Sequence, residues 1–482
     1  MTERTPRAAR SPESGRKPRH GSLTAAERID ALLDAGTFHE WGAHVEPAAQ
    51  LFGDQPSGGR GDGVIAGFGQ VDGHNVFAFA QDFSVLEGTL GERGAEKIVH
   101  LLDRAADAAA PVVGLLHSNG ARLSEGIASL EACTQVFQRY IAYSGRVPII
   151  AVAMGFCSGF PAYLASLSDL VIMVERTSFL VTTSPAVIRS ATGQRVGLAE
   201  LGGARTHAEL SGVAHLTAPT EAEALLLTRD LLAYLTPGPV LADVPTEAIP
   251  ALPFGPHEAY DVKPLIRAIV DGSRMLELWP RWARNVVCAF VRLGGRSVGV
   301  VANQPLVDAG AVTVDSARKM SRFVRLCDRF GLPLLFLVDV PGILPGIESE
   351  HGGILFEGAQ FYRSLLTEVP RLTLVTRKCY GGAYGLLNSK QGLGAMVLAY
   401  PDAKIGVMGA EVASQILGDG NGKTEELAKA WKVHGESARA AAQRGIVDRL
   451  VEPADTREEL LAAFSLFPPA SPASRLRRSG WL

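Results

Sequence analysis

Two glycine-rich segments that follow apolar runs are the strongest candidates for chemistry in this sequence. They read MGFCSGFPA (154–162) and KCYGGAYGLLNSK (378–390). Each is expected to lead from the end of a buried strand into a helix, where several backbone N–H groups have no partner within the helix. Such donors suit a developing oxyanion. A tight turn that only glycine can adopt is the structural alternative for either segment alone, and two turns at equivalent places weaken that alternative without naming a reaction.

Several familiar catalytic motifs are incomplete. GDGNGKT (418–424) ends like a phosphate-binding loop, but Leu417 stands where that motif needs its first glycine. The G-x-S-x-G match GRSVG (295–299) is expected in a hairpin, which disfavours a serine hydrolase. No H-E-x-x-H occurs among the eleven histidines, and we expect no metal site. The pattern therefore favours chemistry by backbone donors on a substrate that supplies its own acid, base or leaving group.

Charged side chains lie near both turns. Arg122 and Glu125, in GARLSEGI, follow a predicted strand and either contact the substrate or form a structural ion pair. Arg377 and Lys378 directly precede the second turn and either meet a substrate carboxylate or phosphate or remain solvated. We expect none of the four to carry the chemistry.

An internal repeat organises the chain. The segment FGQVDGHNVFAFAQ (68–81) resembles FVRLGGRSVGVVAN (290–303), with Gly73 matching Gly295, and this pair defines one fixed repeat offset. The same offset relates Lys97 to Lys319, His117 to Asp339, Val147-Pro148 to Val369-Pro370, and Gly159 to Gly381. Landmarks this regular predict the duplication of one domain and not a short-period solenoid.

Each copy is expected to contain the same elements. A hairpin with turn residues at its tip comes first, then a helix, a buried strand (112–116; 334–338), a loop rich in small residues and a second helix. A second buried strand (149–152; 372–375) runs into the glycine-rich turn. Strands without alternation, separated by helices, predict parallel pairing covered on both faces.

Size and composition agree with two large cores. The 482 residues are 47% hydrophobic and 20% charged, and a net charge of −3 gives no reason to expect nucleic-acid binding. The five cysteines are dispersed, as is typical of reduced thiols in a cytoplasmic protein. No apolar run is long enough to predict a membrane span. We expect a disordered N-terminal segment at 1–24 and domains at 25–250 and 251–482, with a Pro/Gly-rich linker around 236–262.

The longer motifs resemble one family over most of residues 25–412. The chain is similar to the carboxyltransferase (β) subunits of acyl-CoA carboxylases of the propionyl-CoA and acetyl-CoA type, within the crotonase superfamily. The matching segments, in the order of the family, are GDGVIAGFGQVDG, FAQDFSVLEGTLGERGAEKI, SNGARLSEGI, ELGGARTHAELSGVAH, VANQP, LVDVPGILPGIESEHGGI, TRKCYGGAYGLLNSK and MVLAYPDAKIGVMGAE.

This resemblance implies two tandem crotonase-like (ββα-spiral) α/β domains and a homohexamer built as a dimer of trimers. The N-terminal domain would bind the acyl-CoA, with the Gly159 and Phe160 amides on the thioester oxygen. Arg122, Arg377 and Lys378 are possible contacts to coenzyme A or to a carboxylate.

The C-terminal domain would bind biotin. By resemblance, the Gly382 and Ala383 amides would hold the ureido oxygen of carboxybiotin, Gly381 would permit the turn, and Tyr384 would line the biotin site. The next residue is a selectivity position of the family, commonly Asp or an apolar residue, and here it is Gly385. The missing side chain predicts an acyl group longer or more branched than propionyl, unless a neighbouring bulky residue fills the space.

The chain departs from the family pattern at several places. Gly159-Phe160-Pro161 replaces the usual Gly-Gly-Ala, and the bulk of the phenylalanine and the following proline could narrow the thioester site. His117 and Asn119 are unusual in HSNGAR, and 414–437 replaces a longer Arg-rich segment. These departures indicate a specialised paralogue, for instance from secondary metabolism.

The resulting hypothesis is a cytoplasmic carboxyltransferase that moves a carboxyl group from N-carboxybiotin to the α-carbon of an acyl-CoA. It needs a biotin carboxylase and biotin carrier (α) subunit as a separate chain, because no A-M-K-M biotinylation site occurs here. One alternative is a biotin-independent 2-carboxyacyl-CoA decarboxylase of the malonyl- or methylmalonyl-CoA type. The other is a non-catalytic scaffold in a carboxylase complex, which the altered Phe160-Pro161 turn favours.

Overall fold

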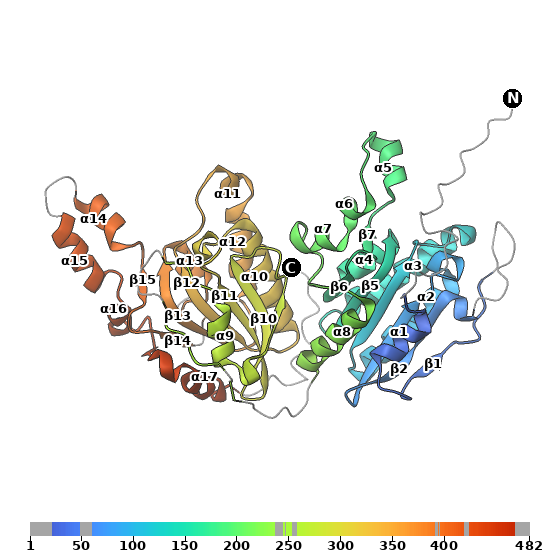
Figure 1. Cartoon of the computed structure of the whole chain (residues 1–482), viewed down its shortest axis with the longest axis horizontal. Helices are drawn as coiled ribbons and strands as arrows, with labels where there is room; N and C mark the ends of the chain where they lie inside the picture. The colour runs from blue at the N-terminus through green and yellow to red at the C-terminus, as the bar shows by residue number, and fades with distance from the viewer. Residues whose placement is uncertain are drawn as a thin grey trace. The chain divides into compact units, whose positions relative to one another are not determined.

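The computed structural model describes residues 22–48, 60–236, 244–245, 247–252, 258–390, 394, 396–418 and 424–467. The chain divides after Thr236 into two compact units, coloured blue to green and yellow to red in Figure 1. Most of the predicted disordered segment lies outside the described residues. From Ser22 onward the chain is in contact with the first unit, and Thr24 caps the first helix by accepting a hydrogen bond from the Glu27 amide.

The first unit is built on one sheet in the order β1-β2-β3-β4-β5-β6-β8, with β7 paired to β5. Strands β1 to β3 pair antiparallel and the remaining pairs are parallel. The strands are β1 His39–Trp41, β2 Val64–Val71, β3 His74–Gln81, β4 Val112–Ser118, β5 Ile149–Ser158, β6 Leu170–Val174, β7 Phe179–Val181 and β8 Leu216–Ala218. The helices are α1 Ala25–Leu32, α2 Glu92–Ala108, α3 Ile127–Tyr143, α4 Phe160–Leu167, α5 Pro185–Thr192, α6 Leu198–Gly202, α7 Ala204–Glu209 and α8 Glu221–Leu235.

The second unit repeats this plan in the order β16-β14-β13-β12-β11-β10-β9, with β15 paired to β13. Its strands are β9 Met275–Leu278, β10 Val286–Leu293, β11 Arg296–Asn303, β12 Leu334–Val340, β13 Arg371–Tyr380, β14 Met396–Ala399, β15 Lys404–Gly406 and β16 Arg449–Leu450. Its helices are α9 Lys263–Ile269, α10 Val314–Arg329, α11 Ile347–His351, α12 Ile354–Ser364, α13 Gly382–Leu386, α14 Ala410–Gly418, α15 Thr424–His434, α16 Ala438–Gln443 and α17 Thr456–Ser465.

The predicted duplication is confirmed strand by strand. The first residues of β2, β3, β4 and β5 are related to those of β10, β11, β12 and β13 by the same offset that relates Gly73 to Gly295. The buried strands are parallel as predicted, and their apolar side chains form the core of each unit because helices cover the sheet. Beyond the glycine-rich turn of each unit the offset is slightly larger, since β7 begins at Phe179 and its counterpart β15 begins at Lys404. Two α/β units with one topology are therefore the frame that carries the two turns.

The repeated lysines explain part of this local structure. The Lys319 ammonium is fully buried and donates to the carbonyls of Trp279 (3.0 Å), Trp282 (3.0 Å) and Val286 (2.7 Å). Lys97 donates in the same way to the carbonyls of Gly61 and Val64. Each lysine therefore ties a helix to the backbone at the start of the neighbouring hairpin, where carbonyls would otherwise be buried without a donor.

Candidate active site

The C-terminal turn leaves two neighbouring amides open. Gly381 follows β13 with φ 60° and ψ −146°, a backbone conformation that favours glycine, and its own N–H donates to the Gly406 carbonyl (3.1 Å). Helix α13 begins at the next residue. Within the described part of the chain, the N–H groups of Gly382 and Ala383 have no acceptor. Two adjacent donors at one strand end are the arrangement that a developing oxyanion requires.

The N-terminal turn differs from the sequence expectation. Gly159 has φ 67° and ψ −115°, but its N–H already donates to the Val181 carbonyl (2.9 Å). The Gly159 amide, which the sequence predicted to hold the thioester oxygen, therefore already has an acceptor in this structure, because β7 takes that donor. Pro161 has no N–H, and the Ala162 amide donates back to the Gly159 carbonyl (3.1 Å). Among the residues described here, Phe160 is left as the open amide of this turn.

The duplication shows what the proline changes. At the repeat offset, Phe160 and Pro161 correspond to Gly382 and Ala383, so the N-terminal turn lacks one donor that the C-terminal turn keeps. Phe160 is 9% exposed and its ring stacks on Phe137, with centroids 4.6 Å apart. Its bulk therefore packs into the core, and the missing N–H is the larger consequence of the altered motif.

The loop after β4 carries a further open amide beside the N-terminal turn. The Leu90 N–H donates to the Gly120 carbonyl, and the Arg122 N–H donates to the Leu90 carbonyl, both at 2.9 Å. Ala121 lies between these two bonds, so its own N–H points away from Leu90, and no described residue accepts it. A Cβ at Gly120 would stand 3.1 Å from the Ser158 carbonyl, which places this loop beside the turn.

The C-terminal unit has the equivalent loop. The Val312 N–H donates to the Gly342 carbonyl (3.0 Å), and the Leu344 N–H donates to the Val312 carbonyl (2.9 Å). Ile343 lies between these two bonds, as Ala121 does in the first unit. A Cβ at Gly382 would meet the Ile343 side chain at 3.5 Å. Sequence reasoning missed both loop amides. The signal was present, because both loops are rich in small residues and follow strands at the repeat offset.

Arg122 is a structural residue and not an open substrate contact. It is 2% exposed, and its guanidinium bonds to Asp62, Glu125 (2.8 Å) and the Thr89 carbonyl (2.8 Å). Burial raises the pKa of Asp62, an effect that the neighbouring guanidinium opposes. Arg122 therefore forms a structural ion pair, which was one of its two predicted roles. The resulting network holds the loop that carries the Ala121 amide.

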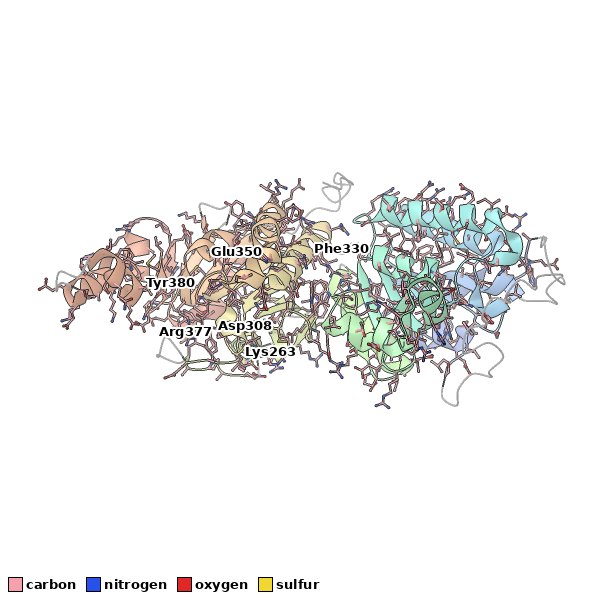
Figure 2. All side chains as sticks on the ribbon, turned by 90° about the horizontal axis from the view of Figure 1, so that it is seen from above. Lys263, Asp308, Phe330, Glu350, Arg377 and Tyr380 are labelled. Carbon is pink, nitrogen blue, oxygen red and sulfur yellow. The ribbon has the colours of Figure 1, made fainter. Side chains whose placement is uncertain are left out.

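Arg377 and Lys378 are buried and not solvated (Figure 2 labels Arg377). The Arg377 Nε donates to Asp339 (2.9 Å), and its guanidinium lies 5.0 Å from the centre of the Tyr260 ring. The Lys378 backbone N–H also donates to Asp339 (3.2 Å), and its ammonium lies 3.9 Å from the same carboxylate. Burial raises the pKa of Asp339 and lowers that of Lys378. Both cations line a cavity of about 690 Å³ that also contains Tyr380.

A smaller cavity of about 360 Å³ lies at the open amides of the C-terminal unit. Gly381, Gly382 and Tyr384 line it, and burial raises the pKa of the Tyr384 hydroxyl. Its other walls come from the end of β15 and from residues 434–446. A Cβ at Gly385 would have no atom of a described residue within 4 Å, so none of the described side chains fills that space.

The described part of the chain has no metal-binding cluster, no helix suited to cross a membrane and no exposed cysteine. No group of three or more His, Cys, Asp or Glu residues there is arranged to hold a metal ion. None of the helices there is both long and apolar enough to cross a membrane. All five cysteines are free and buried, and burial raises the pKa of Cys379, next to the turn, to about 12.

Comparison with known proteins agrees with this geometry. A family model described as "Carboxyl transferase domain" matches residues 16–473. The chain is 41% identical over 464 residues to a propionyl-CoA carboxylase beta chain of Cereibacter sphaeroides, covering 93% of this chain and 91% of that protein. It is 42% identical over 466 residues to the propionyl-CoA carboxylase carboxyltransferase subunit of Haloferax mediterranei, with coverage of 92% and 90%.

Solved structures give the same result. Transcarboxylase 12S, with methylmalonyl-coenzyme A and methylmalonic acid bound, matches with a TM-score of 0.89 at 36% identity, covering 93% of this chain and 92% of that chain. A single-chain, multi-domain long-chain acyl-CoA carboxylase matches with a TM-score of 0.82 at 29% identity, covering 92% of this chain and 46% of that one.

The two units have the crotonase-like fold, and the chain belongs to the carboxyl transferase family. Within that family it is a carboxyltransferase of the acyl-CoA carboxylase β type. The resemblance stated from the sequence motifs is thus confirmed, as is the predicted fold class.

Proposed function

We propose that this chain moves the carboxyl group of N-carboxybiotin, presented on a separate biotin carrier, to the α-carbon of an acyl-CoA. The observation that supports this most directly is the pair of open amides at Gly382 and Ala383, beside the cavity of about 360 Å³. The ureido oxygen of biotin gains negative charge when the carboxyl group leaves, and preorganised N–H donors stabilise such charge.

The two units divide the work in this proposal. The Phe160 and Ala121 amides hold the thioester oxygen while the acyl-CoA becomes an enolate. Carboxybiotin is a substrate here: cleavage of its N–C bond releases CO₂ and leaves negative charge on the ureido group, which takes the α-proton. The thioester enolate then forms the new C–C bond to CO₂. No side-chain base is needed, and none of the described residues near the turns is assigned that role.

The proposed partners are a biotin carboxylase and biotin carrier subunit and further copies of this chain in a hexamer, a dimer of trimers. The similar transcarboxylase 12S structure is described as a hexamer assembly. Exposed apolar side chains such as Leu123 (84% exposed), Ile127 (78%) and Leu355 (77%) are suited to subunit contacts. A cytoplasmic location is part of the proposal and is supported by the five free cysteines.

For the acyl group we propose a chain longer or more branched than propionyl. The support is the open space at Gly385, where an added Cβ meets nothing within 4 Å. The alternative in which a neighbouring bulky residue fills the space finds no support in this geometry.

Gly385→Ile and Gly385→Asp test the acyl preference. Both should lower kcat/KM for long or branched acyl-CoAs relative to propionyl-CoA, by about tenfold, because the new side chain occupies space that the acyl group uses. The measurement is competition between acyl-CoAs in one reaction. Tyr163→Phe, on the exposed surface of α4, is a control that should leave the ratio unchanged. An unchanged ratio in both Gly385 variants would refute the proposed preference.

Two alternatives remain, and Pro161 favours the second of them because it removes a donor from the N-terminal turn. One is a biotin-independent 2-carboxyacyl-CoA decarboxylase, and the other is a non-catalytic scaffold. A single reconstitution separates the three functions: the purified chain with a carboxylated biotin carrier and a panel of acyl-CoAs. Carboxylated product supports the proposed function, CO₂ release from 2-carboxyacyl-CoA without biotin supports the decarboxylase, and neither supports the scaffold.

A further inference from the structure

The cavity of about 360 Å³ is lined by a guanidinium that has no partner among the described residues. Arg444 lines this cavity together with Gly382, and no described residue forms an ion pair or a hydrogen bond with its side chain. The arginine in the neighbouring larger cavity is different, because Arg377 is held by Asp339 and by the Glu258 carbonyl.

The backbone of Arg444 is fixed although its side chain is exposed. Arg444 is the C-cap of α16, and its N–H donates to the carbonyls of Ala441 and Ala442. Gly445 follows with φ 68°, and the Ile446 N–H returns to the Ala441 carbonyl (3.0 Å). The backbone of Arg444 is therefore held at the rim of the cavity by an ordered turn.

The rest of the lining determines what the cavity can hold. Ala440, Ala441 and Ile405 are buried and give it an apolar wall, while the Gly382 amide provides a donor. None of its described lining residues is Asp or Glu, so nothing of opposite charge there compensates the guanidinium. An apolar pocket with one cation and a backbone donor suits a compact ligand that carries one negative charge.

We propose that Arg444 binds the carboxylate of carboxybiotin and makes the site selective for the carboxylated carrier over the uncarboxylated one. This inference rests on the proposed function and adds a specificity-determining residue to it. Guanidinium and carboxylate groups form paired, charge-assisted hydrogen bonds, which an uncharged ureido ring cannot replace. The contact is made in the ground state and disappears as CO₂ leaves, so it contributes to binding and not to the rate of the chemical step.

Steady-state kinetics of the full chain with carboxylated and uncarboxylated biotin carrier test the proposal. Arg444→Gln should raise KM for the carboxylated carrier about tenfold to a hundredfold without lowering kcat. Product inhibition by the uncarboxylated carrier should stay within about twofold of wild type. Arg444→Lys keeps the charge but loses the paired hydrogen bonds, so its KM for the carboxylated carrier should lie between those of wild type and Arg444→Gln. Arg439→Gln, exposed on the same helix but outside the cavity lining, should behave as wild type.

The outcomes separate the two levels of the proposal. An unchanged KM in Arg444→Gln, with an active wild type and an unchanged melting temperature, overturns the role of Arg444 alone. An equal loss of affinity for carboxylated and uncarboxylated carrier also overturns it, because the contact would then be to the carrier or the ring. A wild type that cannot use the carboxylated carrier with any acyl-CoA overturns the proposed function and this inference with it.

Discussion

Pro161 and Ala383 occupy equivalent positions in the two turns and differ in whether a backbone N–H exists. Each is the second residue of a helix that follows a glycine with positive φ. The equivalence makes the two turns internal controls for each other, because proline is already tolerated at this position in one of them. In the proposed function, the N-terminal turn binds the acyl-CoA and takes its second donor from Ala121 in a different loop, while the C-terminal turn has two open amides in sequence.

Exchanging these residues tests how much one amide contributes. Ala383→Pro should lower kcat by about 10²–10³, because it removes one donor from the ureido oxygen. Pro161→Ala adds a donor to the acyl-CoA turn and should speed exchange of the acyl-CoA α-proton by about tenfold. The kcat of Ala383→Pro is measured as the rate of carboxylation, and α-proton exchange in Pro161→Ala is measured as deuterium incorporation into the acyl-CoA. A folded Ala383→Pro protein with wild-type kcat would contradict the assignment of that amide.

At the scale of elements, the ion pairs of Arg122 connect the loop after β4 to helix α2. Asp62 accepts from the Gly94 amide (2.7 Å) and Glu125 accepts from the Glu92 amide (2.7 Å), so both carboxylates also hold the first turn of the helix. The loop that carries the Ala121 amide is thus fixed by a buried network, so in the proposed function these charged side chains position a donor through the backbone and not by contact with the substrate.

Removing that arginine should be costly. Arg122→Ala leaves two buried carboxylates without their cation and should lower the free energy of unfolding by about 3–5 kcal/mol. Arg93→Ala removes an exposed ion pair to Glu96 and should leave the free energy of unfolding almost unchanged. Urea denaturation of the two variants measures the difference. Equal stabilities would show that the buried network does not hold the loop.

The sequence predicted the elements better than the partners of their backbone groups. Strands β4 and β5 and their counterparts followed from apolar runs, and the repeat offset placed both turns. It could not predict that Gly159 donates to Val181, because β7 has three residues and its pairing with β5 depends on the tertiary fold. The burial of Arg377 and Lys378 and the cavity at Arg444 also depend on side chains that are far apart in the chain.

The burial of the five cysteines shows that both hydrophobic cores of the molecule exclude water from their thiols. Cys157 and Cys379 occupy equivalent places in β5 and β13, and Cys133, Cys288 and Cys327 are also buried. Burial raises the pKa of Cys157 and Cys379 to about 12. Since the thiolate is the nucleophile, only about 10⁻⁴ of each thiol is reactive at pH 8.

We therefore expect iodoacetamide at pH 8 to leave the native protein unmodified and active, and to label all five cysteines in denaturant. The pH dependence has a defined sign. A pKa of about 12 in the fold, against a usual value of 9.0, means that the folded state keeps protons that the unfolded state loses. The contribution of these thiols to stability is complete below pH 9 and falls as pH rises from 9 to 12. Mass spectrometry counts the labels, and urea midpoints measured across this range follow the stability. Rapid labelling of Cys379 at pH 8, or loss of carboxylation on labelling, would contradict a site that works through backbone amides packed on a closed core.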